Sequence, residues 1–232
     1  MEPLFLIGDY IEYRPLSTID DRAGSTVIGV VTQEAGRRAE YAAATRQAIL
    51  LAARALFVER GYFDTRVQDI ARAARVAEPT VYAAVGGKSG VLRTLIEDGV
   101  RAAEAGGIHE RIAAQTDPGA LLRMLVDGTR SEFELWSPIM RQATAVAPQD
   151  AAIRKTVETA HESLRRGLRA TAARLGELSA LRADITVEEA ADVLWYFLGN
   201  ASYFTLTDGC RWPLDRCADW LYHALTAALL DK

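Results

Sequence analysis

The hydrophobic positions between residues 41 and 95 recur with the period of α-helices and fall into short blocks. The first block carries one apolar stripe at spacings of three and four residues, formed by Ile49, Ala52, Ala53, Leu56 and Phe57. Gly61 follows this stripe and suits the position just beyond a helix end, because glycine adopts a positive φ without steric cost. The pattern therefore predicts a helix that starts near Tyr41 and ends before Gly61.

Two shorter helical blocks follow, and the three residues Arg75–Ala77 separate them. The first block opens with Thr65 and Gln68 at the spacing of a capping box. Its predicted buried face consists of Val67, Ile70, Ala71 and Ala74. The second block has Pro79 in its first turn, where the missing N–H costs nothing, and Lys88 begins a longer helix after it. Two short helices joined by a tight turn are typical of a helix-turn-helix that reads the DNA major groove.

The chain beyond Gly107 keeps a helical pattern to its end. Apolar periodicity and breakers predict helices near 108–115, 118–136, 138–146, 150–175, 186–207 and 213–230. The prolines at 118, 138, 148 and 213 lie at or near predicted starts, where proline is tolerated. We therefore predict an all-α protein of about nine helices, with a three-helix DNA-binding domain and a larger helical domain.

The predicted domains are an N-terminal extension over 1–40, a helix-turn-helix domain over 41–95 and a helical domain over 96–232. Residues 1–36 show no helical period. They are interpreted either as a poorly ordered arm or as the result of a wrongly assigned start, with Val31 as the alternative first residue.

Charge is distributed unevenly along the chain. The formal net charge is −4, which by itself does not indicate a nucleic-acid partner. Residues 37–95, however, carry ten Lys and Arg against five Asp and Glu, whereas the segments on either side are acidic. Because a phosphate backbone responds to charge within about a Debye length, ~8–10 Å at physiological salt, this basic module favours DNA binding.

The composition also narrows the class of protein. The chain has two cysteines, Cys210 and Cys217, and no apolar run of about 18 residues, so we expect a cytoplasmic protein without a membrane-spanning segment. Its three histidines are far apart and form no metal-ligand motif, and no nucleophile–base pair is recognisable. We therefore predict neither a metal, nor a cofactor, nor an enzyme.

The predicted recognition helix has an inward and an outward side. Val81 and Val85 can face the core, while Glu78, Thr80, Tyr82 and Ala84 are available outward. The hydroxyls of Thr80 and Tyr82 can donate to phosphate oxygens. Lys88 at the following helix start adds a cation where the helix dipole also attracts phosphate. Arg66 and Gln68, at the start of the preceding helix, can reach the backbone or base edges.

The segment Thr45–Leu95 resembles the DNA-binding domain of the TetR family of bacterial transcriptional regulators. The matching residues are Ile49, Ala52, Ala53, Leu56, Phe57, Glu59, Arg60, Gly61, Tyr62, Thr65, Val67, Asp69, Ile70, Ala71, Ala74, Val76, Pro79, Thr80, Val81, Tyr82, Lys88 and Leu92. The predicted DNA contacts are Thr65, Arg66, Gln68, Glu78, Pro79, Thr80, Tyr82, Ala83, Ala84 and Lys88.

Several residues depart from the family pattern. Arg75 stands where the turn commonly has glycine, and a left-handed conformation there costs about 1 kcal/mol or more. Ala77 replaces the usual Ser or Thr cap, which costs about 1 kcal/mol. Ala83 and Ala84 occupy positions that are often polar, so we expect base readout to depend on Arg66, Gln68, Thr80, thymine methyl contacts and DNA shape.

The resemblance implies a repressor that acts as a homodimer through its last two helices and is released from a double-stranded operator by a small-molecule effector. A mostly apolar pocket is expected in the helical domain, with its signal passing along the helix that starts at Lys88. Its candidate lining residues are Phe133, Trp136, Met140, His161, Trp195, Tyr196 and Tyr203. Two alternatives stay open: a ligand-binding dimer of the same fold with weak or lost DNA binding, and a helical interaction module without ligand.

Overall fold

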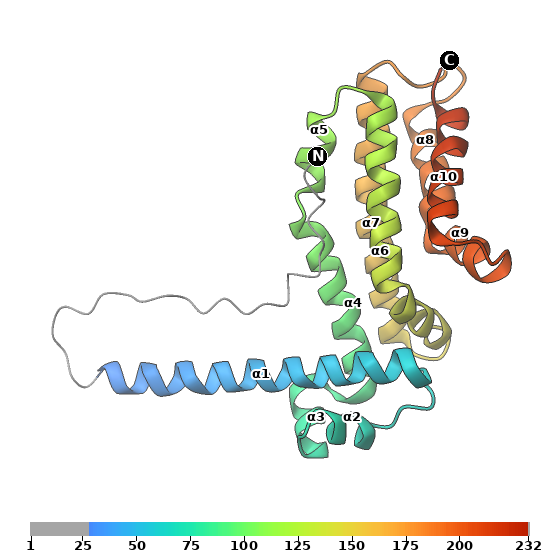
Figure 1. Ribbon diagram of the computed structural model, residues 1–232. Helices are drawn as coiled ribbons and strands as arrows, with labels where there is room; N and C mark the ends of the chain where they lie inside the picture. The colour runs from blue at the N-terminus through green and yellow to red at the C-terminus, as the bar shows by residue number, and fades with distance from the viewer. Residues whose placement is uncertain (1–27, 232) are drawn as a thin grey trace. The chain divides into compact units, whose positions relative to one another are not determined.

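A computed structural model describes residues 28–231, and side-chain surroundings from residue 36 onward. The described residues are almost entirely helical (Figure 1), and their only extended pairing is an isolated bridge between Leu181 and Leu230. This confirms the predicted all-α class. Among the same residues, no helix combines the length and the hydrophobicity that crossing a membrane requires.

Four helices form the N-terminal part of the described chain: α1 (Ile28–Arg60), α2 (Val67–Ala73), α3 (Glu78–Val85) and α4 (Gly87–Ala105). The stripe predicted on α1 is its buried face, with Ile49, Ala53 and Phe57 fully buried. Gly61 has φ 83° and ends α1 as predicted. The chain divides into two units at Tyr41, and α1 crosses that division.

The start of α1 corrects the sequence analysis, which placed the first helix from Tyr41. The helix begins at Ile28 instead, so residues 28–40 of the predicted extension are helical. This segment lacks an apolar stripe, but residues 33–40 are Ala, Glu, Gln and Arg apart from Gly36, and the intrinsic helix propensity of these residues does not depend on burial. The predicted disorder of residues 1–27 lies outside the described residues.

The larger part consists of α5 (Ile108–Ala114), α6 (Pro118–Val146), α7 (Ala151–Glu177), α8 (Val187–Leu198), α9 (Asn200–Phe204) and α10 (Leu214–Leu229), with a π-helical turn at Thr205–Gly209. Helices α6 and α7 lie in the middle, with α4 and α5 on one side and α8 and α10 on the other (Figure 1).

Two predicted boundaries in this part are wrong. Pro138 does not begin a helix, as predicted from its residue type, but lies inside α6, because the buried positions continue across it to Ile139 and Met140. The predicted helix 186–207 is divided at Gly199, whose extended backbone, with ψ 155°, interrupts the helical hydrogen bonds. A Cβ there would lie 2.9 Å from the carbonyl oxygen of Trp195, so glycine permits this close turn.

The apolar interior forms two separate clusters. The first core joins α1–α4 to the end of α6 and the start of α7. The second core joins the beginning of α6 and the end of α7 to α8 and α10. Each core covers a different half of α6 and of α7, so the boundary between the two cores lies near the middle of both helices.

Candidate nucleic-acid interface

Helix α3 is held on one side and exposed on the other. Val81 and Val85 are buried in the first core, as predicted. Pro79, Tyr82 and Ala83 lie on the opposite side and are exposed, with Tyr82 retaining 54% of its accessible surface. An exposed face on a clamped helix is the geometry that a major-groove reader needs.

The turn before α3 has the conformation expected from its sequence. Arg75 has φ 57°, in the left-handed region, as predicted from its place in the turn. The N–H of Val76 bonds to the Ala71 carbonyl at 2.9 Å, and the N–H of Arg75 bonds to the Arg72 carbonyl at 3.2 Å. These two bonds form a Schellman motif, in which arginine occupies the position that glycine usually takes. Ala77 is the N-cap of α3 and contributes no side-chain cap, also as predicted.

The end of α3 is fixed by a residue that the sequence analysis missed. Arg46 of α1 donates one hydrogen bond to the Ala84 carbonyl at 2.9 Å and another to the Thr94 hydroxyl at 3.3 Å. One guanidinium therefore connects α1, α3 and α4. Its position one helical turn before Ile49 was the available signal, but the sequence does not show which carbonyl it meets.

Helix α4 follows α3 almost without a linker because of two glycines. Gly86 and Gly87 both have φ 76°. A Cβ on Gly87 would lie 2.8 Å from the Tyr82 ring, so that ring packs over the glycine while most of its surface faces solvent. Tyr82 is thus positioned for an external contact without being buried.

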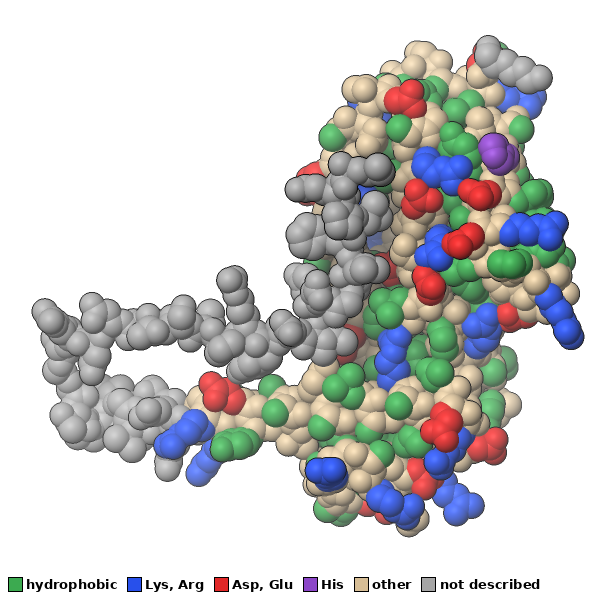
Figure 2. Space-filling model, viewed as in Figure 1, with side chains coloured by type: hydrophobic (Ala, Val, Ile, Leu, Met, Phe, Trp, Pro, Cys, Tyr) green, Lys and Arg blue, Asp and Glu red, His purple; other side chains and the backbone are tan. Residues whose placement is uncertain are grey.

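Exposed arginines lie on α2 and in the segments next to α3, the predicted recognition helix. Arg66, Arg72 and Arg75 are all exposed, and Figure 2 shows Lys and Arg side chains gathered over the end where α2 and α3 lie. Arg72 has 81% of its side chain accessible and only a 3.9 Å ion pair with Asp69. Arg72 and Arg75 are not among the predicted contacts, although Arg72 follows the predicted Gln68 by one helical turn.

Two predicted contacts do not fit the structure as proposed. Thr65 is 1% exposed, and its hydroxyl donates to the Gly61 carbonyl at 2.7 Å. The predicted Thr65–Gln68 box is also wrong: Arg66 is the N-cap of α2, and its N–H bonds to the Asp69 carboxylate at 3.1 Å. Thr65 therefore stabilises the loop between α1 and α2 through an internal hydrogen bond. Its residue type did not indicate whether the hydroxyl would face the loop or solvent.

Lys88 likewise has an internal partner. Its ammonium donates to the Tyr62 carbonyl at 2.9 Å and lies 4.2 Å from the centroid of the Tyr62 ring. Partial burial lowers the pKa of Lys88, and nearby Asp64 opposes that effect. The side chain therefore ties α4 to the loop after α1, instead of extending freely toward phosphate. Of the remaining predicted contacts, Arg66 and Gln68 are exposed, while Glu78, Thr80 and Ala84 are partly exposed.

The predicted effector residues do not meet in one pocket. Phe133 stacks on Tyr203 with a centroid distance of 4.7 Å in the second core, whereas Trp136 and Met140 belong to the first core. The Tyr203 hydroxyl lies 3.1 Å from the Thr129 hydroxyl, and burial raises the pKa of Tyr203 to about 12. Phe133 and Tyr203 are therefore core residues whose packing and hydrogen bonding are complete. Their aromatic character alone could not distinguish core residues from residues that line a pocket.

The other predicted effector residues lie nearer the surface. His161 contacts Trp195 with a centroid distance of 5.4 Å, and Tyr196 is 72% exposed. Trp195 borders a depression that Arg165, Arg169 and Asp192 also line. Tyr196 instead begins an aromatic series that runs from α8 to α10 and ends at Trp212, just before α10. Successive centroids lie 5.3 to 6.0 Å apart along Tyr196, Phe197, Trp220 and Trp212.

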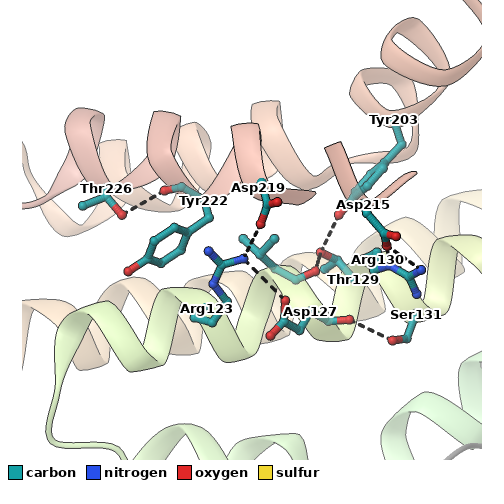
Figure 3. Close-up of polar contacts among 11 residues, drawn as sticks. Arg123, Asp127, Thr129, Arg130, Ser131, Tyr203, Asp215, Asp219, Tyr222 and Thr226 are labelled. Carbon is teal, nitrogen blue, oxygen red and sulfur yellow. Dashed lines mark hydrogen bonds and ion pairs between the residues drawn. The ribbon is translucent and has the colours of Figure 1, made fainter. Parts of the chain in front are cut away.

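Polar contacts fasten α10 to α6 (Figure 3). Arg123 pairs with Asp219 at 3.2 Å, and its guanidinium stacks 3.9 Å from the Tyr222 ring centroid. Arg130 pairs with Asp215 at 2.8 Å. The position of α10 is therefore set by α6 through ion pairs as well as by the second core.

The geometry places the chain in the class of helix-turn-helix proteins that carry a larger helical domain. Residues 49–95 match the family described as bacterial regulatory proteins, tetR family. The match covers the helix-turn-helix, so residues 49–95 form a DNA-binding domain of the tetR-family type. Proteins of this family are DNA-binding regulators and not enzymes. No curated protein matches the chain.

Solved structures share the fold beyond the matched domain. A candidate transcriptional regulator from Saccharomonospora viridis in complex with choline aligns with TM-score 0.67 and 19% identity, over 81% of this chain and 98% of that one. A SmeT–triclosan complex aligns with TM-score 0.66 and 20% identity, over 82% and 93% of the two chains. The ketosteroid transcriptional regulator KstR2 of Mycobacterium tuberculosis aligns with TM-score 0.58 and 18% identity, over 81% and 95%. The helical body is thus built like those of these proteins.

Proposed function

We propose that the chain is a dimeric transcriptional repressor that binds an operator through α2 and α3 and leaves it when a small, largely apolar effector binds the helical body. The observation that carries this proposal is the exposed face of α3, clamped from behind by Arg46 and bordered by Arg66 and Arg72. The proposed direct contacts are Arg66, Gln68, Arg72, Pro79, Thr80, Tyr82 and Ala83.

The aromatic series that runs from α8 to α10 and to Trp212, just before α10, supports a dimer. Tyr196 and Trp220 are 72% and 44% exposed within the aromatic series described above. Contiguous exposed aromatic surface is costly on a monomer and typical of interfaces. A dimer would also supply two recognition helices for half-sites separated by about one DNA turn, roughly 34 Å.

The dimer proposal is tested with one substitution on this surface and one away from it. Trp220→Glu should lower the mass found by light scattering from that of a dimer to that of a monomer. Phe63→Glu, which changes another exposed aromatic residue on the loop after α1, should leave the mass unchanged. A Trp220→Glu protein that stays dimeric would place the interface elsewhere.

DNA binding is tested by a gel shift with the promoter region of the chain's own gene. We expect a shifted complex that competitor DNA of unrelated sequence does not displace. Tyr82→Ala should weaken this complex without changing the thermal unfolding midpoint by more than a few degrees. Absence of any specific complex would favour the alternative of a ligand-binding dimer that has lost its operator, for which the uncapped α3 and the apolar Ala83 give a physical reason.

Effector binding is proposed on the fold it shares with the choline and triclosan complexes. Helix α4 begins directly after α3 and packs on both α6 and α7, so a ligand between these helices has a short route to the DNA-binding domain. A ligand that binds the DNA-free form more tightly shifts the population toward that form.

A further inference from the structure

The inward stripe of α6 is interrupted near its middle. Residues at spacings of three and four share one face of a helix, and on this face Leu121, Leu125, Ile139 and Ala143 are buried. Between the two apolar pairs the same face carries Gly128, Glu132 and Trp136. Glu132 thus holds the central position of a stripe that is otherwise apolar.

This interruption coincides with the boundary between the two cores. On α6 the second core ends with Phe133, and the first begins at Trp136. On α7 the first core ends at Ala160, and the second begins at Leu164. Because α6 and α7 run antiparallel through a short connection, Glu132 lies at about the height of this boundary on α7.

The helices around this boundary contribute small residues. The Cα of Gly99 on α4 faces Trp136, since a Cβ there would lie 3.1 Å from the indole ring. A Cβ on Gly128 or Gly167 would meet no heavy atom within 4 Å, so both positions adjoin open space. Neither Gly128 nor Gly167 is therefore covered by a side chain of a neighbouring helix.

Two polar groups at this place have no partner among the described residues. The indole N–H of Trp136 is buried and makes no hydrogen bond. The Glu132 carboxylate makes neither an ion pair nor a hydrogen bond within residues 36–231, and burial raises its pKa. Its neighbour on the other face, Glu134, is paired with Arg130 at 2.6 Å. The carboxylate oxygens of Glu132, unlike the Trp136 N–H, are not fully buried, so a charged group from outside the chain can reach them.

Cations of α7 at this height do not pair with the Glu132 carboxylate. Arg165 stacks on Trp195, 4.2 Å from the ring centroid. Arg166 pairs with Glu104 of α4. On the other side of Trp136, the Arg54 guanidinium lies 4.6 Å from the indole centroid and donates to the Leu135 carbonyl. The charge of Glu132 is left for something other than these side chains.

We propose that the effector is an organic cation whose charge lies against Glu132, between α4, α6 and α7, with its apolar part against the small residues and Trp136. The proposal rests on the proposed effector binding and specifies its chemistry.

The test uses cations and a matched uncharged compound. Tetramethylammonium, phenyltrimethylammonium and tetraphenylphosphonium are titrated into the full-length protein by calorimetry, and tert-butylbenzene serves as the uncharged isostere of the second. We expect at least one of the cations to bind, and phenyltrimethylammonium to bind at least tenfold more tightly than tert-butylbenzene. Glu132→Gln should weaken cation binding at least tenfold, Glu132→Asp should weaken it less, and Glu188→Gln, on the exposed surface of α8, should have no effect.

Folding is followed in the same samples. Glu132→Gln should unfold at the same or a higher temperature than the wild type, because it removes a partly buried charge. The proposal is overturned if none of the three cations binds the wild type, if the isostere binds as tightly as its cation, or if Glu132→Gln binds cations like the wild type. A gel shift separates this outcome from the proposed function: specific DNA binding without cation binding overturns the inference alone, and cation binding without DNA binding overturns the repressor proposal alone.

Discussion

Arg72 offers the sharpest test of the DNA-binding surface, because it contributes little else. Its side chain is 81% exposed and its one ion pair, with Asp69, spans 3.9 Å. An exposed pair of this kind stabilises a helix by about 0.3–0.5 kcal/mol. Arg72→Ala should therefore change the free energy of unfolding by less than about 0.5 kcal/mol, while removing a full positive charge from the proposed interface.

The expected effect on DNA follows from counterion release. Each phosphate neutralised by the protein adds about 0.9 to the slope of the logarithm of affinity against the logarithm of salt concentration. A dimer with Arg72→Ala loses one such contact in each protomer, so the slope should become shallower by about 1.8. Between 50 and 200 mM salt, the variant should lose about twelvefold less affinity than the wild type does.

Fluorescence anisotropy with a labelled operator at four or more salt concentrations measures both slopes. Arg111→Ala, an exposed arginine on α5, is the matched control and should keep the wild-type slope. A slope for Arg72→Ala equal to that of the wild type would refute the placement of α2 against the phosphate backbone, even if DNA binding itself is retained.

Three further predictions concern stability as well as binding. Arg75→Gly should raise the free energy of unfolding by up to about 1 kcal/mol, because glycine adopts the left-handed conformation of this position without strain. The loss of the cation should also weaken DNA binding. Urea titration measures the stability and anisotropy the binding, and a less stable variant would contradict the strain argument. Lys88→Met should destabilise the domain by about 1–3 kcal/mol, because it removes a charged hydrogen bond to the Tyr62 carbonyl. The salt dependence of DNA binding by the folded variant should stay that of the wild type. A shallower salt dependence would show that Lys88 contacts phosphate after all. Burial raises the pKa of Glu132 above its ordinary value of 4.5, so the folded protein binds this proton more tightly. The free energy of unfolding should therefore fall as the pH rises from the ordinary value through the raised one, and urea titrations of Glu132→Gln across the same pH range should lack that decrease.

The helix-turn-helix could be predicted from the sequence because its signals are local. The stripe on α1, Gly61 at its end and Pro79 in the first turn of α3 each act within a few residues, and the structure places all of them as expected. The left-handed Arg75 follows from the same reasoning, since a turn of three residues after a helix requires one positive φ. These features depend on backbone conformation, which nearby residues largely determine.

Side-chain partners across helices could not be predicted in the same way. Thr65 and Lys88 were read as external contacts from their residue types, but the hydroxyl meets a carbonyl nine or fewer residues away, and the ammonium meets one 26 residues away. The partners of Arg46 lie 38 and 48 residues away. The boundary of α6 at Pro138 failed for a related reason, because packing on both sides of the proline outweighs the lost hydrogen bond.

The aromatic residues chosen for the effector pocket show why composition is a poor guide to a binding site. Phe133 and Tyr203 stack in a filled core, where every contact is satisfied. Trp136, chosen by the same criterion, has an indole N–H with no partner among the described residues. The difference lies in the hydrogen bonding of their polar atoms, which the sequence does not show. Glu132 was not predicted as a site residue because its carboxylate is one of many on the helices of this chain.

Trp136 also connects the proposed cation site to α1 and α4, the helices that flank α2 and α3 in the chain. Its ring contacts Gly99 of α4 on one side and the Arg54 guanidinium of α1 on the other. A ligand that moves this indole would therefore disturb its contact with the α4 backbone or with the Arg54 guanidinium, which is bound to the Leu135 carbonyl. Because the contact to Gly99 has no flexible side chain to absorb such a movement, the displacement would reach α4 as a shift of its backbone. This is the physical basis on which occupation of the Glu132 site could change the spacing of two recognition helices.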